Sequence, residues 1–231
     1  NALGEMAASI AHEINQPLTA ISLFSQTGKN FIEKGKYERL PVIFEKISLH
    51  ARRAGKVLER VQLMTRQGDR SKEVIASDIL IDEVKKLAES EARLRDISIQ
   101  LITCKEKTNV FVDRVQIQQV ILNLLRNGME AMQSIVCKNG ALIKLQIIVN
   151  TEKNVEISVV DTGCGIPKTM MDKLFTPFST TKKNGTGIGL SISKSIVEEH
   201  GGHIHFSENK PAGAIFYFTL PIHEEGIPND K

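Results

Sequence analysis

The sequence predicts two parts of different fold class: an α-helical hairpin that pairs with a second copy to form a four-helix bundle, and then an α+β two-layer sandwich. Apolar residues recur at helical spacing from Leu3 to Met64, whereas helical and strand-like patterns alternate in the remainder. A polar segment, residues 67–71, separates the two patterns. A chain of 231 residues is long enough for two domains. We therefore expect domains at residues 1–70 and 71–231.

The first part contains two amphipathic helices. Their apolar stripes cover residues 3–33 and 42–64, and Gly35 and Pro41 punctuate the short connection between them. A single hairpin leaves most of each stripe without a partner. Because pairing two hairpins into a four-helix bundle covers both stripes, we expect a homodimer through this hairpin.

The second part mixes helices and strands. Periodicity predicts helices at residues 79–95, 115–132 and 190–200, and strands at residues 97–102, 110–112, 141–149, 155–160, 204–206 and 215–220. Several of these strands are adjacent in sequence, which favours an α+β sandwich.

The composition excludes several classes of function. Lys and Arg number 30 against 27 Asp and Glu, and the excess is not clustered, so no nucleic-acid partner is expected. No apolar run reaches a membrane-spanning length, so we expect no membrane contact from this fragment, although its parent protein can be membrane-bound. The three cysteines lack metal-site spacing and indicate reduced thiols, hence a cytoplasmic location. The chain opens on Asn1, as an excised fragment would.

His12 is the first candidate for chemistry. It lies about 200° around the helix from Ile10 and Ile14, and therefore points away from the apolar stripe. An exposed imidazole is mostly neutral near neutral pH and hence nucleophilic. Glu13 can act as a base by accepting the second ring proton. Gln16, four residues on, shares this face and can orient a water molecule.

Pro17 follows this pair within the same helix. It cannot donate to the carbonyl of Glu13, which weakens or bends the helix one turn beyond the histidine. Taken alone, a His-Glu pair is more often a solvated surface feature. The segment Ala8–Ile21 nevertheless resembles the phosphoacceptor motif of sensor histidine kinases. Its Asn-Gln-Pro version resembles the subclass typified by rhizobial oxygen sensors and C4-dicarboxylate sensors.

A second set of motifs begins with Asn123 and Asn127, two carboxamides four residues apart on one helical face. A carboxamide oxygen can ligate Mg²⁺ together with phosphates and water, and a buried hydrogen-bonded role fits the pair equally well. The run Asp161–Pro167 (Asp-Thr-Gly-Cys-Gly-Ile-Pro) follows a strand. Its carboxylate can accept from an exocyclic amine, and its glycines let the backbone approach a flat ring. An ordinary Asx turn is the alternative.

The run Gly185–Leu190 (Gly-Thr-Gly-Ile-Gly-Leu) opens a helix. Glycines at that position expose backbone N–H groups to phosphate, which the helix dipole also favours. The spacing matches neither the dinucleotide fingerprint nor a Walker loop. Before this run, Phe175 and Phe178 can anchor a loop whose polar tip, residues 179–184, moves over bound nucleotide. Without that context the tip is a solvated loop.

The four motifs, in this order, resemble the N, G1, F and G2 boxes of the ATP-binding domain shared by histidine kinases, gyrase, heat-shock chaperones and mismatch-repair ATPases (the GHKL or Bergerat fold). With the histidine motif, the resemblance covers residues 1–222. It implies that Asn127 coordinates Mg²⁺ and that Asp161 binds the adenine amine. It implies further ATP contacts from Asn123, Gly163, Gly165, Lys182, Gly185, Thr186, Gly187, Gly189 and Leu190. The lid, residues 178–185, is short, as in the same subclass.

The residue at position 123 distinguishes ATP hydrolysis from phosphoryl transfer to a protein side chain. In this superfamily the relatives that hydrolyse ATP carry a glutamate there, whereas Asn123 cannot act as a general base. The resemblance therefore implies ATP-dependent autophosphorylation of His12, with Glu13 as base, and transfer of the phosphoryl group to an aspartate of a response regulator receiver domain. Gln16 replaces the Thr or Asn usual at the phosphatase position of many relatives. It is the candidate for positioning water during regulator dephosphorylation.

Two alternatives stay open. A nucleotide-sensing dimerisation module without kinase activity would bind ATP, but it has no use for the exposed pair His12 and Glu13. A protein-serine kinase or free ATPase of the same superfamily is disfavoured by the helical hairpin and by Asn123.

Overall fold

The computed structural model describes residues 2–65, 72–104, 106–133, 141–150, 153–177, 179–182 and 187–224; in the first two helices it describes side chains only within residues 14–55, residue 53 excepted. The chain divides into two compact units: residues 1–68 with residues 181–186, and residues 69–180 with residues 187–231. The expected domain boundary between residues 70 and 71 lies outside the described ranges and stays a prediction.

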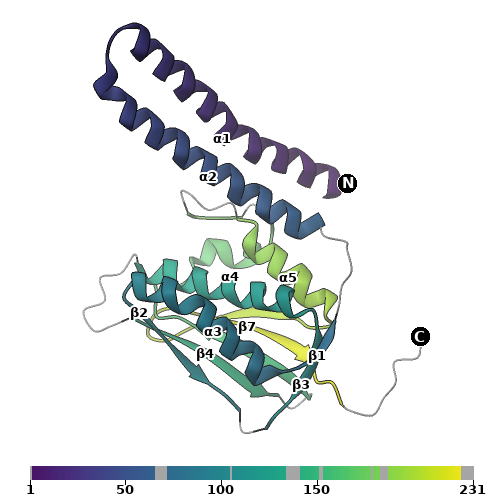
Figure 1. The fold of residues 1–231 in the computed structure, drawn as a ribbon. Coiled ribbons are helices and arrows are strands. Elements are labelled where there is room, and N and C mark those ends of the chain that lie inside the picture. Colours follow the sequence, from purple (N-terminus) through teal and green to yellow (C-terminus); the bar gives the residue numbers. More distant parts are fainter. Residues whose placement is uncertain are drawn as a thin grey trace. The chain divides into compact units, whose positions relative to one another are not determined.

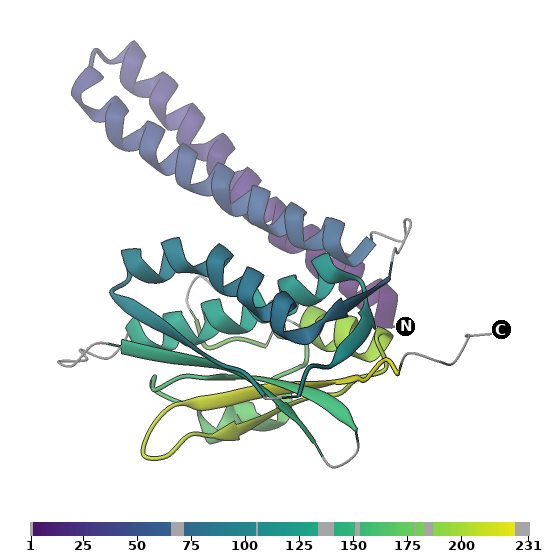
Figure 2. The ribbon, with the colours of Figure 1, turned by 60° about the horizontal axis from the view of Figure 1, so that its bottom comes forward.

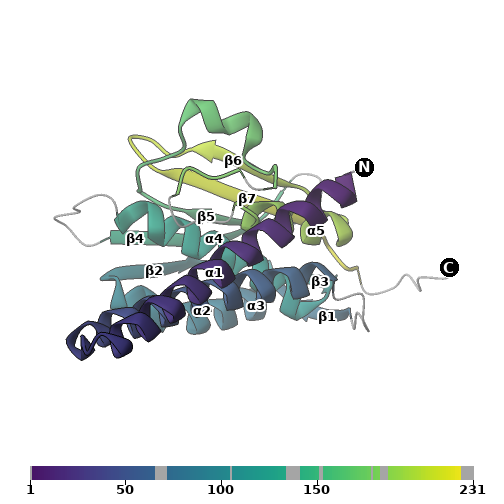
Figure 3. The ribbon, with the colours of Figure 1, turned by 90° about the horizontal axis from the view of Figure 1, so that it is seen from above.

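The first unit is a helical hairpin, as the periodicity predicts. Helix α1 (Ala2–Glu33) and helix α2 (Leu40–Thr65) lie side by side, joined through the 3-10 turn η1 (Tyr37–Arg39) (Figures 1 and 3). Helix α1 continues through Pro17, so the missing N–H removes one hydrogen bond without ending the helix. Although α1 has 32 residues, no helix within the described ranges is apolar enough over the length that a membrane span needs.

Gly35 ends α1. Its φ is +66°, a left-handed conformation that glycine adopts at little cost. The N–H of Gly35 donates to the carbonyl of Ile32 at 3.0 Å. The N–H of Lys36 donates to the carbonyl of Phe31 at 2.8 Å, which completes a Schellman arrangement. Helix α2 then begins with Pro41 in its first turn, where the proline N–H is not needed.

Within residues 14–55, the part of the hairpin whose side chains the structure describes, few side chains are buried. A Cβ on Gly28 would be 3.3 Å from Ile43 Cγ2, so glycine permits a close approach of the two helices at a buried position. In this described part, six apolar side chains are 43% to 64% exposed: Leu18, Leu23, Ile32, Val42, Phe44 and Leu49. This is the pattern expected of a hairpin whose apolar surface is covered by further helices.

The second unit has two layers (Figures 1 and 2). A five-stranded sheet has the order β2-β4-β5-β7-β6, and helices α3, α4 and α5 cover one of its faces. Its strands are β2 (Ile97–Ile102), β4 (Ala141–Val149), β5 (Asn154–Val160), β6 (Ile204–Glu208) and β7 (Ala214–Pro221). Strands β2 and β4 are parallel, and the other neighbours are antiparallel. The expected α+β sandwich is therefore confirmed.

Alternation along the strands directs apolar side chains toward the helices. In β5, Val155, Ile157 and Val159 are buried while Glu156 is half-buried. The helices are α3 (Ser77–Leu94), α4 (Arg114–Gln133) and α5 (Gly189–Glu199). The largest fully buried side chains come from both layers: Phe218, Leu80, Ile81, Ile117, Ile121, Leu124, Leu125, Met129, Ile143, Leu145, Ile157 and Ile188. All predicted helices and strands of this part are present, with ends shifted by a residue or two.

Three short elements lie outside the sequence prediction. Strand β1 (Glu73–Ala76) pairs antiparallel with β3 (Asn109–Val112) in a separate two-stranded sheet. The turns η1 and η2 (Lys168–Lys173) are 3-10 helices. Strand β1 has a single buried residue, Ile75, so its sequence carries no alternation that would reveal a strand.

Candidate nucleotide-binding site

Helix α4 brings the sequence-predicted nucleotide motifs together. Its apolar residues are buried in the core and fix the rotation of the helix. Asn123 and Asn127 lie four residues apart, share one face of α4 and are half-buried. The first turn of α5 and the turn after β5 both contact α4.

Asn123 contacts the start of α5. Its Nδ2 donates to Ser193 Oγ at 2.9 Å. A Cβ on Gly189, the first residue of α5, would be 2.6 Å from Asn123 Oδ1. Glycine is therefore required at position 189 for the asparagine to keep its place. This contact joins the predicted asparagine pair to the predicted phosphate loop.

Asp161 follows β5 and is buried, with 2% of its surface exposed. Its Oδ1 accepts hydrogen bonds from the N–H groups of Gly163 (2.8 Å) and Ala214 (3.2 Å). A Cβ on Gly128 of α4 would be 3.2 Å from Asp161 Cβ, so α4 approaches the carboxylate closely. A carboxylate has several acceptor positions, so one that is oriented by main-chain donors can accept from a ligand as well.

The turn after Asp161 lies against the C-terminal part of α4. A Cβ on Gly163 would be 2.7 Å from Ala131 Cβ, which is closer than side chains approach. The N–H of Cys164 donates to the carbonyl of Ala131 at 3.4 Å, and Gly165 has a φ of +71°. The glycines thus permit close backbone packing toward α4, and their approach to a flat ring stays a prediction.

The second glycine motif is described only in part. Gly185 and Thr186 lie outside the described residues. Gly187 has a φ of +67°, and Leu190 is half-buried in the first turn of α5. The first N–H groups of any helix lack intrahelical partners, and this turn is next to Asn123. Lys182 is exposed. Phosphate contacts by these residues stay predictions.

His200 links the ends of the two helices that form the site. Its buried ring has Nδ1 at 2.7 Å from the carbonyl of Ile196, and Nε2 accepts from the N–H of Asp113 at 3.0 Å. Burial lowers the pKa of His200, which favours the neutral ring that this arrangement requires. Asp113 Oδ1 in turn accepts from the N–H of Gln116 at 3.1 Å and caps α4.

Ion pairs connect α3 to α4 beside the asparagines. Arg126 donates to Glu91 of α3 at 3.0 Å, and Arg95 donates to the same carboxylate at 2.8 Å. Partial burial raises the pKa of Glu91, but the two guanidinium groups outweigh it and the pKa is lowered. Because these groups are partly exposed, their contribution to stability is modest and mainly fixes the orientation of α4.

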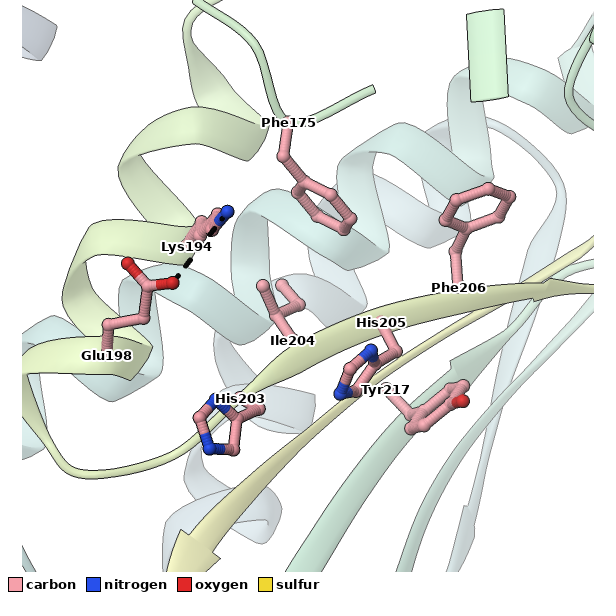
Figure 4. A pocket seen from close by; sticks show the side chains of 8 residues that line it. All are labelled: Phe175, Lys194, Glu198, His203, Ile204, His205, Phe206 and Tyr217. Atoms are coloured by element: carbon pink, nitrogen blue, oxygen red, sulfur yellow. Dashed lines mark ion pairs between the residues drawn. The ribbon is translucent and has the colours of Figure 1, made fainter. Parts of the chain in front are cut away.

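A pocket of about 400 Å³ lies between α5, β6, β7 and Phe175 (Figure 4). The Phe175 ring is 6.4 Å from that of Phe206, centroid to centroid, which agrees with its predicted role as an anchor. Phe178 lies outside the described residues. Lys194 and Glu198, which line the pocket, form an ion pair at 3.8 Å. Among the residues that the structure describes, none of the predicted nucleotide contacts lines this pocket.

The predicted phosphoacceptor lies on α1. The backbone at His12 and Glu13 is helical, and their side chains lie outside the description. Gln16 is exposed and Pro17 is buried. The exposure of Gln16 agrees with a solvent-facing side of α1, while the roles of all three polar residues stay predictions.

Two family models match the chain. The His Kinase A (phospho-acceptor) domain matches residues 2–70, and the histidine kinase-, DNA gyrase B-, and HSP90-like ATPase matches residues 112–224. The solved catalytic domain of histidine kinase ThkA is 37% identical, covers 65% of this chain and 95% of its own, and has a TM-score of 0.56. The chain belongs to the sensor histidine kinase family.

Longer histidine kinases are also similar to this one. A crystal structure of ThkA in complex with the response regulator protein TrrA is 31% identical, with a TM-score of 0.71, over 95% of this kinase chain and 61% of that chain. Sensor protein FixL of Bradyrhizobium diazoefficiens is 36% identical over 97% of this chain. This kinase chain spans 45% of the length of that relative. The expected family is confirmed.

The fold adds residues to the candidate site that the sequence motifs do not contain. Ser193 bonds Asn123, His200 links α4 to α5, and Asn209 donates to the carbonyl of Asp161 at 2.8 Å. Ser193 lies one helical turn after Gly189, which is the one local signal that could have found it. The others come from distant parts of the chain.

Proposed function

We propose that the chain is the catalytic core of a dimeric sensor histidine kinase. It uses ATP to phosphorylate its own His12 and then passes the phosphoryl group to an aspartate on a response regulator receiver domain. One observation carries this proposal: the asparagine pair, the turn after β5 and the start of α5 converge along α4. A site for a base, a triphosphate and a metal ion requires all three.

The ATP groups are assigned from the chemistry of the residues. The Asp161 carboxylate accepts from the adenine 6-amino group. Backbone N–H groups of Gly187 and Gly189 face the phosphates at the start of α5, with Lys182 as a further cationic contact. Asn127 would hold Mg²⁺ through its carboxamide oxygen, because Mg²⁺ prefers oxygen ligands. Bound Mg²⁺ supplies charge neutralisation at the phosphates.

The proposed transfer is a displacement at the γ-phosphorus. A ring nitrogen of neutral His12 forms the P–N bond, the P–O bond to the β-phosphate breaks, and ADP leaves with the electron pair. The proton on the other ring nitrogen passes to Glu13, which keeps the product ring neutral. Holding the ring and the γ-phosphate in line supplies much of the rate gain.

The chemistry of Asn123 favours phosphoryl transfer over hydrolysis of ATP. Its amide donates to Ser193 Oγ, and a carboxamide has no basic site that could take a proton from water. Water positioning during regulator dephosphorylation is assigned instead to the exposed Gln16.

The hairpin supplies the proposed partner surfaces. Residues 1–70 are assigned to dimerisation and phosphotransfer, and residues 71–231 to ATP binding. The exposed apolar side chains of α1 and α2 would be covered in a homodimer. Because the reaction draws on cytoplasmic ATP, we expect this portion to act in the cytoplasm.

The test is incubation of the chain with γ-labelled ATP and Mg²⁺, followed by acid and alkali treatment. Phosphohistidine is a phosphoramidate, so the label should be lost in acid and kept in alkali. His12→Gln should abolish the label while far-ultraviolet circular dichroism and the dimer mass stay unchanged. His50→Gln, which changes another histidine of the hairpin, should keep the label. A labelled His12→Gln protein would refute the assignment of the acceptor.

The alternative function, a nucleotide-sensing dimerisation module, makes a different prediction in the same assay. Such a protein would bind ATP, with Asp161 as the base contact, and would show no acid-labile label at any Mg²⁺ concentration.

A further inference from the structure

The turn between β6 and β7 packs directly against Asp161. Nδ2 of Asn209 donates to the backbone carbonyl of Asp161 at 2.8 Å. The N–H of Asp161 donates to the carbonyl of Ala214 at 2.9 Å, and the N–H of Ala214 donates to Asp161 Oδ1 at 3.2 Å. The N–H of Asn209 donates to the carbonyl of Gly213 at 3.1 Å and closes the turn. Asn209 therefore bonds both the turn and the aspartate.

The contact between the turn and the aspartate leaves no spare space. Gly213 has a φ of +115°, and a Cβ there would be 2.0 Å from the carbonyl oxygen of Asp161. This carbonyl is the group that Asn209 holds, so the side chain and the turn backbone restrain the same peptide. Asn209 is half-buried, so water replaces a lost hydrogen bond only in part.

We propose that Asn209 is a positioning residue for adenine recognition: by holding the Asp161 carbonyl, it sets the direction in which the carboxylate meets the exocyclic amine. This inference rests on the proposed function, in which Asp161 accepts that amine. Hydrogen bonds weaken steeply as their angle closes, so a small rotation of the carboxylate reduces base recognition. A site built around one hydrogen bond discriminates against the ligand that lacks the donor. Loss of Asn209 should therefore lower the discrimination between ATP and an analogue without the 6-amino group more than it lowers the affinity for the triphosphate.

The experiment measures the Kd of the whole chain for ATP and for purine riboside 5′-triphosphate, which lacks the 6-amino group, by titration calorimetry with Mg²⁺. The readout is the Kd for purine riboside 5′-triphosphate divided by the Kd for ATP. Asn209→Asp keeps the shape and replaces the donor by an acceptor, and Asn209→Ala removes the group. The ratio should fall about three- to tenfold in both variants. Ser207→Ala, an exposed change on the same hairpin, should keep the wild-type ratio.

Asp161→Asn separates this inference from the proposed function. If it leaves the ratio at the wild-type value, Asp161 is not the base contact and the proposed function of that residue fails. If Asp161→Asn lowers the ratio and both Asn209 variants keep it, only the positioning role of Asn209 is overturned. Asn209 variants that weaken both nucleotides equally, or that unfold, also overturn it, because Asn209 would then support the fold alone.

Discussion

Substitution of Gly189 by alanine tests the contact between α5 and the asparagine pair. The new Cβ would lie 2.6 Å from Asn123 Oδ1 and 3.2 Å from its Cγ and Nδ2, so one group must move. All three atoms belong to the end of a side chain. Rotation of the Asn123 amide is therefore the least costly response, and it breaks the 2.9 Å hydrogen bond to Ser193.

The magnitudes follow from these contacts. Overpacking costs about 1–3 kcal/mol, and the lost hydrogen bond is worth about 1 kcal/mol. Alanine in place of glycine stabilises a helix by about 0.5–1 kcal/mol in its interior, and by less in its first turn. We expect a net loss of about 1–3.5 kcal/mol in the free energy of unfolding, which lowers Tm by about 3–10 °C at this size. The rate should fall further, by roughly 10–100-fold, because Asn123 would leave the place beside the phosphates that the proposed function gives it.

Thermal unfolding and the initial rate of phosphohistidine formation measure the two effects separately. Ser193→Ala is the matched control, since it removes the hydrogen bond without introducing a clash. It should cost about 1 kcal/mol of stability and only a few-fold in rate. Wild-type Tm and rate in Gly189→Ala would refute the reasoning. Equal rate losses in the two variants would show that the hydrogen bond, and not displacement of Asn123, carries the effect.

Three further predictions concern the fold, pH and Mg²⁺. Gly202→Ala should cost about 3 kcal/mol or more and lower Tm by at least about 6 °C, because its Cβ would be 1.7 Å from the backbone carbonyl of Thr219; a Tm within experimental error of wild type would contradict this. Burial lowers the pKa of His200, so the unfolded chain binds the proton more readily and stability should fall as pH drops below about 6.5. Urea unfolding at two pH values should show this loss of stability in the wild type and a smaller loss in His200→Ala, a variant that also lacks the hydrogen bond to the N–H of Asp113. If the pH dependence of stability is the same in both proteins, His200 is not its source. EDTA should abolish labelling, and Asn127→Ala should raise the Mg²⁺ concentration for half-maximal labelling about tenfold; an unchanged Mg²⁺ requirement would show that Asn127 is not a ligand.

The regular elements could be predicted because their signals are local. Helix α4 shows buried residues at helical spacing, and β7 alternates buried residues with half-buried or exposed ones. Strand β1 could not be predicted in this way. Its four residues become a strand through pairing with β3, more than 30 residues later, and only Ile75 is buried. A short edge strand depends on its partner and not on its own pattern.

The residues of the candidate site likewise fall into those that local sequence predicts and those that it does not. Asp161 and Gly189 belong to motifs that the sequence displays. Ser193 and Asn209 do not: they meet Asn123 and Asp161 across separations of 70 and 48 residues. Hydrogen bonds between such distant residues depend on how the sheet and helices pack. The spacing of Ser193 after Gly189 marks its place on α5 but does not reveal its partner.

The sequence alone determined which residues can carry the chemistry: a histidine beside a carboxylate, an asparagine pair and two glycine-rich turns, each a local pattern with its own chemical meaning. Only the tertiary structure decided how these groups are held. Burial of the apolar face of α4 sets its rotation, and that rotation places Asn123 under Gly189 and Gly128 beside Asp161. Close packing at these glycines allows one arrangement and excludes others, because a single added Cβ would collide with the neighbouring group.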